Sequence, residues 1–182
     1  GEITPDIENV KDLSCDDISW KDYKIRYLLE NGTYRYQFAK YHVLVKTIDY
    51  PTKKEGYSFG GWSKTENGSI DYCVGDECFI PIGSTSLTLY PVWIPNNNAI
   101  KFNPNGGNGE MSDQMLTTGT THFLNKNLFS KDGYHFIGWA ETKSGGVKYL
   151  DGANYTMGVE SNYVLYAVWE ANENKILFNS TS

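Results

Sequence analysis

The chain has 182 residues, a formal net charge of −6 and 40% hydrophobic residues. This length allows one medium domain or two small ones. The negative charge and the scattered Lys and Arg argue against nucleic-acid binding, which needs clustered positive charge. No apolar run reaches the roughly 18 residues of a membrane span, so we expect no membrane insertion of this segment. With 14 Tyr and 5 Trp, the composition favours a β-rich protein.

The first part of the chain predicts an acidic segment followed by a hairpin. Residues 1–19 are rich in Asp and Glu and are predicted to be an acidic leader. Polar and apolar residues then alternate from Tyr23 to Leu29, as in a half-buried strand. Asn31-Gly32 predicts a tight turn, and residues 34–38 predict the strand that follows it.

Residues 56–60, Gly-Tyr-Ser-Phe-Gly, fit the G-x-S-x-G pattern of a hydrolase nucleophile elbow. The same aromatic frame returns downstream with His135 at the position of Ser58, so the frame is kept and the nucleophile is not. A nucleophile elbow also needs a helix after the serine, whereas a turn-rich stretch follows here. The three histidines show no metal-ligand spacing. We therefore expect no catalytic residue, no metal, no cofactor and no enzyme activity.

Four landmarks recur in order, 77 residues apart by the glycines (133 − 56) and 76 by the closing tryptophans (169 − 93). They are Gly56–Trp62 and Gly133–Trp139, two polar turn-rich stretches, Tyr72-x-x-Gly75 and Tyr149-x-x-Gly152, and the Leu-Tyr-x-Val-Trp segments Leu89–Trp93 and Leu165–Trp169. This period is too long for a solenoid and long enough for a small domain. The pattern predicts tandem modules over 20–93 and 99–169, joined by a linker over 94–98.

The last residues, 170–182, are predicted to be a linker and the possible first strand of a truncated third repeat. Residues 174–179 resemble 98–103, which open the second module. The alternative is a C-terminal strand that pairs with the second module.

Each module is predicted to be a sheet of about four strands with one short crossover. The closing segments alternate as strands do, and Pro91 indicates an edge or a bulge there. Gly119–Ser130 predicts either a short helix or an irregular crossing. The predicted structural core consists of the repeated aromatic and leucine residues: Tyr57, Phe59, Trp62, Leu89, Trp93, Tyr134, Phe136, Trp139, Leu165 and Trp169.

The three cysteines allow at most one intramolecular disulfide. Cys73 and Cys78 enclose a turn-like Val-Gly-Asp-Glu segment, so a disulfide between them is sterically reasonable. Reduced thiols are the alternative. Cys15 lies in the acidic leader and has no predicted structural role.

The combination Gly-Tyr-x-Phe-x-Gly-Trp followed by Leu-Tyr-x-Val-Trp resembles the Listeria–Bacteroides repeat, or internalin B-type repeat. The second module is the closer match, because residues 102–107 also resemble the opening motif of that family. The resemblance implies an α+β, β-rich fold of two tandem β-grasp, ubiquitin-like modules. It also implies a secreted or surface-anchored bacterial protein, with no catalytic centre to carry over.

The resulting prediction is a non-catalytic tandem-repeat segment of an extracellular or cell-surface bacterial protein, acting as a stalk, a spacer and an adhesion-associated module. Its predicted partners are a host or neighbouring-cell protein or glycan and further repeats of the parent chain. The alternative is a carbohydrate-binding module that uses exposed aromatics outside the repeated set. Tyr34, Tyr36 and Tyr41 are the candidates for facing such a ligand.

Overall fold

The computed structural model describes residues 23–40, 43–160 and 162–173. These residues form two compact units: unit 1 takes the described residues up to Thr52 and Phe59–Trp93, and unit 2 takes Lys53–Ser58 and the described residues from Ile94 onward. The acidic leader with Cys15, the candidate Tyr41 and the possible third repeat lie outside the described residues. The module boundaries drawn from the sequence stay a prediction.

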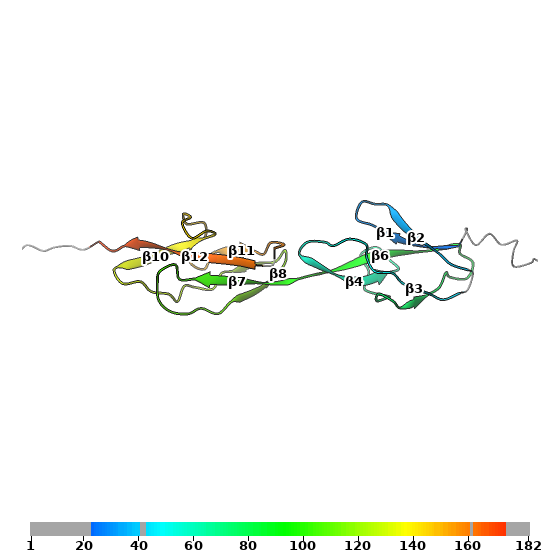
Figure 1. Ribbon diagram of the computed structural model, residues 1–182, viewed down its shortest axis with the longest axis horizontal. Helices are drawn as coiled ribbons and strands as arrows, with labels where there is room; N and C mark the ends of the chain where they lie inside the picture. Colours follow the sequence, from blue (N-terminus) through cyan, green and yellow to red (C-terminus); the bar gives the residue numbers. More distant parts are fainter. Residues whose placement is uncertain (1–22, 41–42, 161, 174–182) are drawn as a thin grey trace, which may run out of the picture. The chain divides into compact units, whose positions relative to one another are not determined.

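Unit 1 contains a four-stranded sheet in the order β2-β1-β6-β4 (Figure 1). Its strands are β1 (Lys24–Leu28), β2 (Tyr34–Phe38), β4 (Tyr57–Ser63) and β6 (Ser86–Pro95), and β3 (Val45–Lys46) pairs with β5 (Glu77–Cys78) in a two-stranded sheet. Strands β1 and β2 form the hairpin predicted at Asn31-Gly32, where Gly32 has a φ of 78°. Strand β6 lies parallel to β1.

Unit 2 repeats this arrangement, with the sheet order β10-β12-β7-β8. Its strands are β7 (Asn97–Asn103), β8 (Gln114–Thr117), β10 (Tyr134–Ala140) and β12 (Asn162–Ala171), and β9 (Thr121–Phe123) pairs with β11 (Asn154–Thr156). The first and last strands, β7 and β12, are again parallel neighbours. The 94–98 segment predicted as a linker comprises the end of β6, Asn96 and the start of β7.

The α+β prediction is wrong, because the described residues contain strands and no helix. The β-grasp prediction is wrong for the same reason, because it depended on a helical crossover. In Gly119–Ser130 the chain instead forms β9 and an extended path. Asn127 fixes part of this path, since its Oδ1 accepts a hydrogen bond from Phe129 N (2.9 Å) and its Nδ2 donates to Phe129 O (2.9 Å). Such local side-chain bonds compete with helix formation.

Pro91 lies in an inner strand and not in an edge strand, because β6 is flanked by β1 and β4. The pairing of β1 with β6 ends at Tyr27 opposite Leu89, two residues before the proline. Pro91 has no backbone N–H to donate, but it lies beyond the part of β6 that pairs with β1, where a proline destabilises the sheet less.

A buried tryptophan forms the centre of each unit. Trp62 and Trp139 are both 0% exposed. Phe59 lies with its ring centroid 5.0 Å from Trp62 and 5.5 Å from Trp93. Phe136 makes the same bridge in unit 2, 4.8 Å from Trp139 and 5.8 Å from Trp169. The predicted core members Leu89 and Leu165 are also buried, so the repeated aromatic frame packs two separate cores.

The repeated tyrosines Tyr57 and Tyr134 were expected in the core, but they lie nearer to the surface. Tyr134 is 42% exposed and Tyr57 is only half-buried. A lysine three residues upstream covers each ring, with Lys131 Nζ 4.2 Å from the Tyr134 centroid and Lys54 Nζ 5.0 Å from the Tyr57 centroid. Tyr134 is therefore a surface residue and Tyr57 a partly buried one, and both make cation–π contacts.

A β-bulge accompanies the glycine before Trp139, and the glycine before Trp62 has a similar backbone conformation. The register of β10 against β12 shifts between Phe136 and Gly138. Gly138 has a φ of 148° and Gly61 a φ of 141°, a region that side-chain-bearing residues avoid. The backbone there also approaches Tyr149 closely, since Trp139 N donates to Tyr149 O at 2.7 Å. In unit 1, Trp62 and Tyr72 make the same bond at 2.8 Å.

Candidate functional site

The candidate site is the solvent-facing side of the β1–β2 hairpin in unit 1. Residues alternate across the two faces of a strand, so the core residues Ile25 and Tyr27 leave Lys24 and Arg26 on the opposite face. The register places Phe38 opposite Lys24, Tyr36 opposite Arg26 and Tyr34 opposite Leu28. We call this set, Lys24, Arg26, Tyr34, Tyr36 and Phe38, the aromatic face.

The aromatic face combines exposed rings with positive charge. Tyr36 is 50% exposed and Phe38 is 52% exposed. Lys24 Nζ lies 5.5 Å from the centroid of Tyr36, and Arg26 Cζ lies 5.6 Å from the centroid of Tyr34. Rings of this kind can stack on the apolar faces of sugars, and neighbouring cations can attract carboxylate or sulfate groups. The arrangement can therefore bind a sugar or an anionic group, but it offers no group for covalent chemistry.

Unit 2 has no aromatic residue on the corresponding edge strand, β8, whose sequence is Gln-Met-Leu-Thr. Ala99 lies opposite Met115, which is 60% exposed, and Asn97 lies opposite Thr117. Since unit 2 forms the same sheet without these rings, the fold does not require the aromatic face. Tyr34 and Tyr36, expected from the sequence to face a ligand, both belong to it. Phe38 and the two cations were missed, although the alternation of residues 24–28 places Lys24 and Arg26 on one side.

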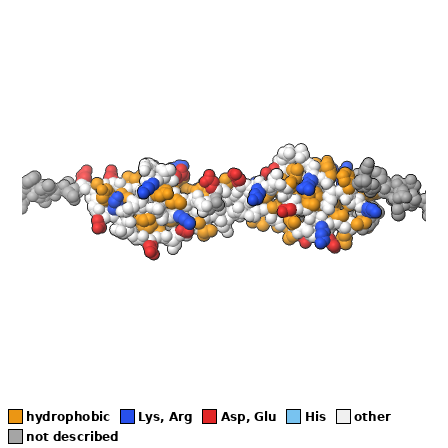
Figure 2. All heavy atoms as spheres, in the orientation of Figure 1, with side chains coloured by type: hydrophobic (Ala, Val, Ile, Leu, Met, Phe, Trp, Pro, Cys, Tyr) orange, Lys and Arg blue, Asp and Glu red, His pale blue; other side chains and the backbone are white. Residues whose placement is uncertain are grey.

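Charged and apolar side chains elsewhere are mixed on the surface. Figure 2 shows hydrophobic, basic and acidic side chains interspersed on the visible face of each unit. The described residues contain no group of three or more His, Cys, Asp or Glu side chains that could hold a metal ion. In the same part of the chain, no helix is long and apolar enough to cross a membrane.

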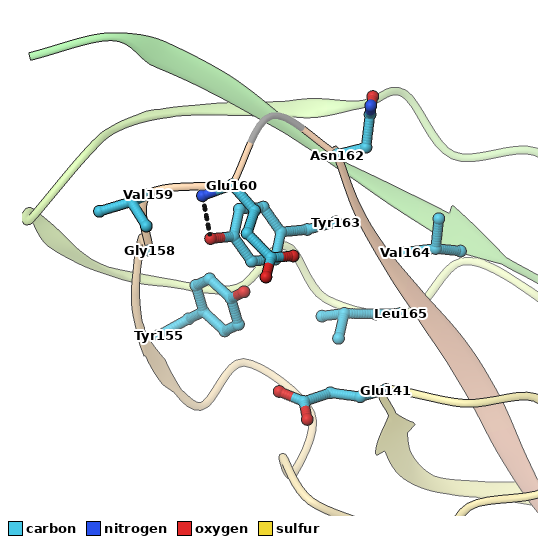
Figure 3. Close-up of a pocket in the computed structure, with 9 residues that line it drawn as sticks. All are labelled: Glu141, Tyr155, Gly158, Val159, Glu160, Asn162, Tyr163, Val164 and Leu165. Carbon is cyan, nitrogen blue, oxygen red and sulfur yellow. Dashed lines mark hydrogen bonds between the residues drawn. The ribbon is translucent and has the colours of Figure 1, made fainter. Parts of the chain in front are cut away.

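A half-open pocket of about 460 Å³ lies in unit 2 (Figure 3). Its described lining consists of Glu141, Tyr155, Gly158, Val159, Glu160, Asn162, Tyr163, Val164 and Leu165. Tyr163 Oη accepts a hydrogen bond from Glu160 N at 2.9 Å, which holds the loop before β12. The titratable groups at its wall include a buried tyrosine and an ion-paired carboxylate.

These two groups are not set up for proton transfer. Burial raises the pKa of the Tyr155 hydroxyl above its ordinary value of 10.0. A hydrogen bond from Lys148, 2.6 Å from the carboxylate, lowers the pKa of Glu141, and Tyr149 donates a further bond at 3.0 Å. Tyr155 thus stays neutral and Glu141 stays ionised around pH 7. Glu141 instead binds Lys148 and Tyr149, and Tyr155 belongs to the buried core of unit 2.

Ser58 lies inside strand β4 and not at a strand-to-helix turn. Its Oγ donates to Asn96 Oδ1 at 2.6 Å. His135 occupies the equivalent place in β10, where its Nδ1 lies 3.0 Å from Asn172 Oδ1 and its Nε2 lies 3.1 Å from Glu170. Ser58 and His135 thus each make a hydrogen bond to the asparagine that follows the last strand of their repeat. We interpret this shared bond as a structural contact.

The two described cysteines are free thiols, Cys73 exposed and Cys78 buried in the core of unit 1. Burial raises the pKa of the Cys78 thiol from its ordinary value of 9.0 to about 11, so this thiol is protonated and a poor nucleophile at neutral pH. Their pairing in an oxidising environment stays a prediction.

The comparison with known families agrees with the repeated geometry. The Listeria-Bacteroides repeat domain model matches residues 23–91 and again 99–168, well over half of the chain. The chain belongs to this family. The Listeria–Bacteroides repeat resemblance drawn from the aromatic landmarks is therefore confirmed.

Curated relatives of this repeat pair include one named as an internalin and two named as membrane proteins. Internalin H of Listeria monocytogenes is 32% identical over 132 residues, which cover 72% of this chain and 22% of the relative. Two proteins of Evansella cellulosilytica named as membrane proteins also match. One, named as Gly-rich, is 32% identical over 70% of this chain and 14% of its own length; the other is 26% identical over 85% and 23%. The chain thus spans less than a quarter of each relative.

No solved structure matches the chain. The relatives are consistent with a surface or membrane-associated location of Listeria–Bacteroides repeats.

Proposed function

We propose that the chain is a non-catalytic spacer within a bacterial surface protein, with an adhesion-associated role. The observation that carries this proposal is the duplication itself: two units have separate cores built on the same strand order. Its relatives contain such a segment as less than a quarter of a longer chain. Repeated folded units add length to a chain without adding new chemistry.

The spacer role predicts that the repeat pair keeps a distal domain accessible at the cell surface. The chain would be displayed between a membrane anchor and a terminal epitope tag, and capture of the cells by antibody-coated beads would be measured. Deleting residues 23–168 is expected to reduce capture severalfold, because the tag then lies within the envelope layer. A matched control replaces the same residues with a Gly/Ser linker, which behaves as a flexible coil. Unchanged capture after the deletion would refute the spacer role.

A second candidate function, binding of an acidic glycan, is favoured by the aromatic face. Tyr36 and Phe38 are exposed, and Lys24 and Arg26 supply the charge that an acidic sugar would need. Unit 2 forms the same sheet without aromatic residues on its equivalent edge strand, so the presence of these rings in unit 1 calls for another explanation. The aromatic face supports the proposal that the adhesive contact lies on unit 1.

The binding role predicts weaker retention of the Tyr34→Ala/Tyr36→Ala variant on an immobilised acidic polysaccharide. Loss of two stacking rings is expected to reduce affinity about tenfold, equivalent to about 1.4 kcal/mol. The matched control is Met115→Ala, which shortens an exposed side chain of the equivalent strand in unit 2. If the tyrosine variant and the control are retained as strongly as the unaltered chain, the aromatic face does not bind glycan.

A further inference from the structure

We propose that each unit is a mechanical clamp, in which the first and last strands form a parallel pair that resists tension applied through the two ends of the unit. This load-bearing function goes beyond the spacer role, because a spacer needs length and not resistance to force. It follows from strand order and register alone.

The two strands that connect each unit to the rest of the chain are direct neighbours. In unit 2, β7 is the first strand and β12 the last, with Ala99 opposite Asn162 and Asn103 opposite Tyr166. In unit 1, β1 and β6 are paired in the same parallel sense, with Lys24 opposite Ser86. All four are drawn in Figure 1, and all four are inner strands of their sheets. Each is therefore held on both sides.

The parallel sense decides how tension acts on this pair. Both strands begin at the same end of the sheet, so the chain enters unit 2 at one end of the pair and leaves it at the other. Tension between entry and exit slides β7 and β12 past each other along their axes. All the hydrogen bonds between them are then stretched together. In an antiparallel pair pulled from its adjacent ends, the bonds would instead break one after another.

Side chains of unit 2 reinforce the pair against sliding. The loop after β7 donates to β12 through Asn105, whose Nδ2 lies 2.9 Å from Ala167 O. Strand β12 donates back through Trp169, whose Nε1 lies 2.9 Å from Pro104 O. The buried residues Ile100 and Leu165 cover the core-facing side of the pair. The backbone bonds of the pair and these two side-chain bonds all oppose the same movement.

The direction of the pull can be tested within one folded chain. Unit 2 has no cysteine, so a background with Cys15→Ser, Cys73→Ser and Cys78→Ala leaves its residues unchanged. Handles are then attached to introduced cysteines at exposed positions. The shearing variant carries Pro95→Cys and Glu173→Cys, which bracket β7 and β12.

The peeling variant carries Asp132→Cys and the same Glu173→Cys. These positions flank the adjacent ends of the antiparallel β10–β12 pair, where Tyr134 lies opposite Ala171. The two variants share every native contact of the sheet and differ only in the direction of loading. Equal hydrogen-exchange protection of both, measured before pulling, establishes that they are equally folded.

The measurement is the unfolding force of unit 2 at one pulling speed. Forced unfolding reports the barrier and not the equilibrium stability. The clamp predicts a force about two- to threefold higher for the shearing variant, since its bonds must break together. Equal forces, or a higher force in the peeling variant, would overturn the clamp. Either outcome leaves the spacer role untouched, because that role is tested by surface capture.

Discussion

Trp139→Ala is expected to remove most of the stability of unit 2 while unit 1 stays folded. Truncating a fully buried tryptophan costs about 3–5 kcal/mol, through lost burial and the cavity left behind. A domain of this size is stabilised by roughly 0.05–0.15 kcal/mol per residue, or about 4–10 kcal/mol for some 70 residues. The loss is therefore comparable to the whole free energy of unfolding. Trp139 also contacts Phe102 and Phe136, with centroids 4.9 Å and 4.8 Å away, so its removal loosens two further rings.

Hydrogen exchange of peptides from each unit is the measurement, because it reports the opening free energy of each region separately. Loss of protection in β10 and β12, with β1 and β6 unchanged, is the expected result. If both units lose protection together, they do not fold as separate units and the duplication argument fails.

The phenylalanine replacements of the two central tryptophans are the controls. Trp62 Nε1 donates to Ile48 O at 2.7 Å, whereas Trp139 Nε1 is buried and has no hydrogen-bond partner among the residues that the structure describes. Trp62→Phe leaves a carbonyl unpaired, which costs about 1–3 kcal/mol, and Trp139→Phe removes a donor that was unpaired already. Trp139→Phe should therefore be the milder change of the two. The reverse order would contradict the assigned roles of the two indole groups.

Gly138→Ala is expected to destabilise unit 2 by about 2–6 kcal/mol. Its φ of 148° is strained for alanine, which costs about 1–3 kcal/mol, and overpacking adds a similar amount. A Cβ at this position would lie 2.6 Å from Tyr149 O and 2.5 Å from Val147 Cγ1. The carbonyl belongs to the backbone that bonds Trp139, so it cannot move away without breaking that bond.

Gly146→Ala is the matched control in the same unit, because a Cβ there meets no atom within 4 Å. It should change the free energy of unfolding by no more than about 0.5 kcal/mol. The hydrogen-exchange protection of β10 and β12 again measures the change. Equal protection in Gly138→Ala and Gly146→Ala would show that the bulge does not require glycine.

The first hairpin and the buried side of its first strand could be predicted because both depend on local sequence signals. Asn31-Gly32 favours a turn by itself, and the alternation of residues 23–29 marks which side of a strand is buried. The strand order could not be predicted from the sequence, because nothing in β1 or β6 specifies that residues some 60 positions apart will pair. A short helix was one of the two predictions for Gly119–Ser130, because the residue pattern there does not reveal the hydrogen bonds between Asn127 and the backbone of Phe129.

The candidate site was predictable only in part. Tyr34 and Tyr36 stood out because unit 2 lacks them, which separates them from the shared core. The contribution of Lys24 and Arg26 depends on the cross-strand register, and register is set by the whole hairpin and not by either strand alone.

The central position of the closing strands has a consequence for how the protein is made. Of the described strands of unit 2, β12 is synthesised last, yet it lies between β7 and β10, so neither can complete its sheet before β12 has been made. Contacts between residues far apart in sequence also form slowly. Each repeat must therefore remain incompletely folded until its final ten or so residues have left the ribosome. A chain that is exported during this interval passes through a secretion channel before its sheet can close.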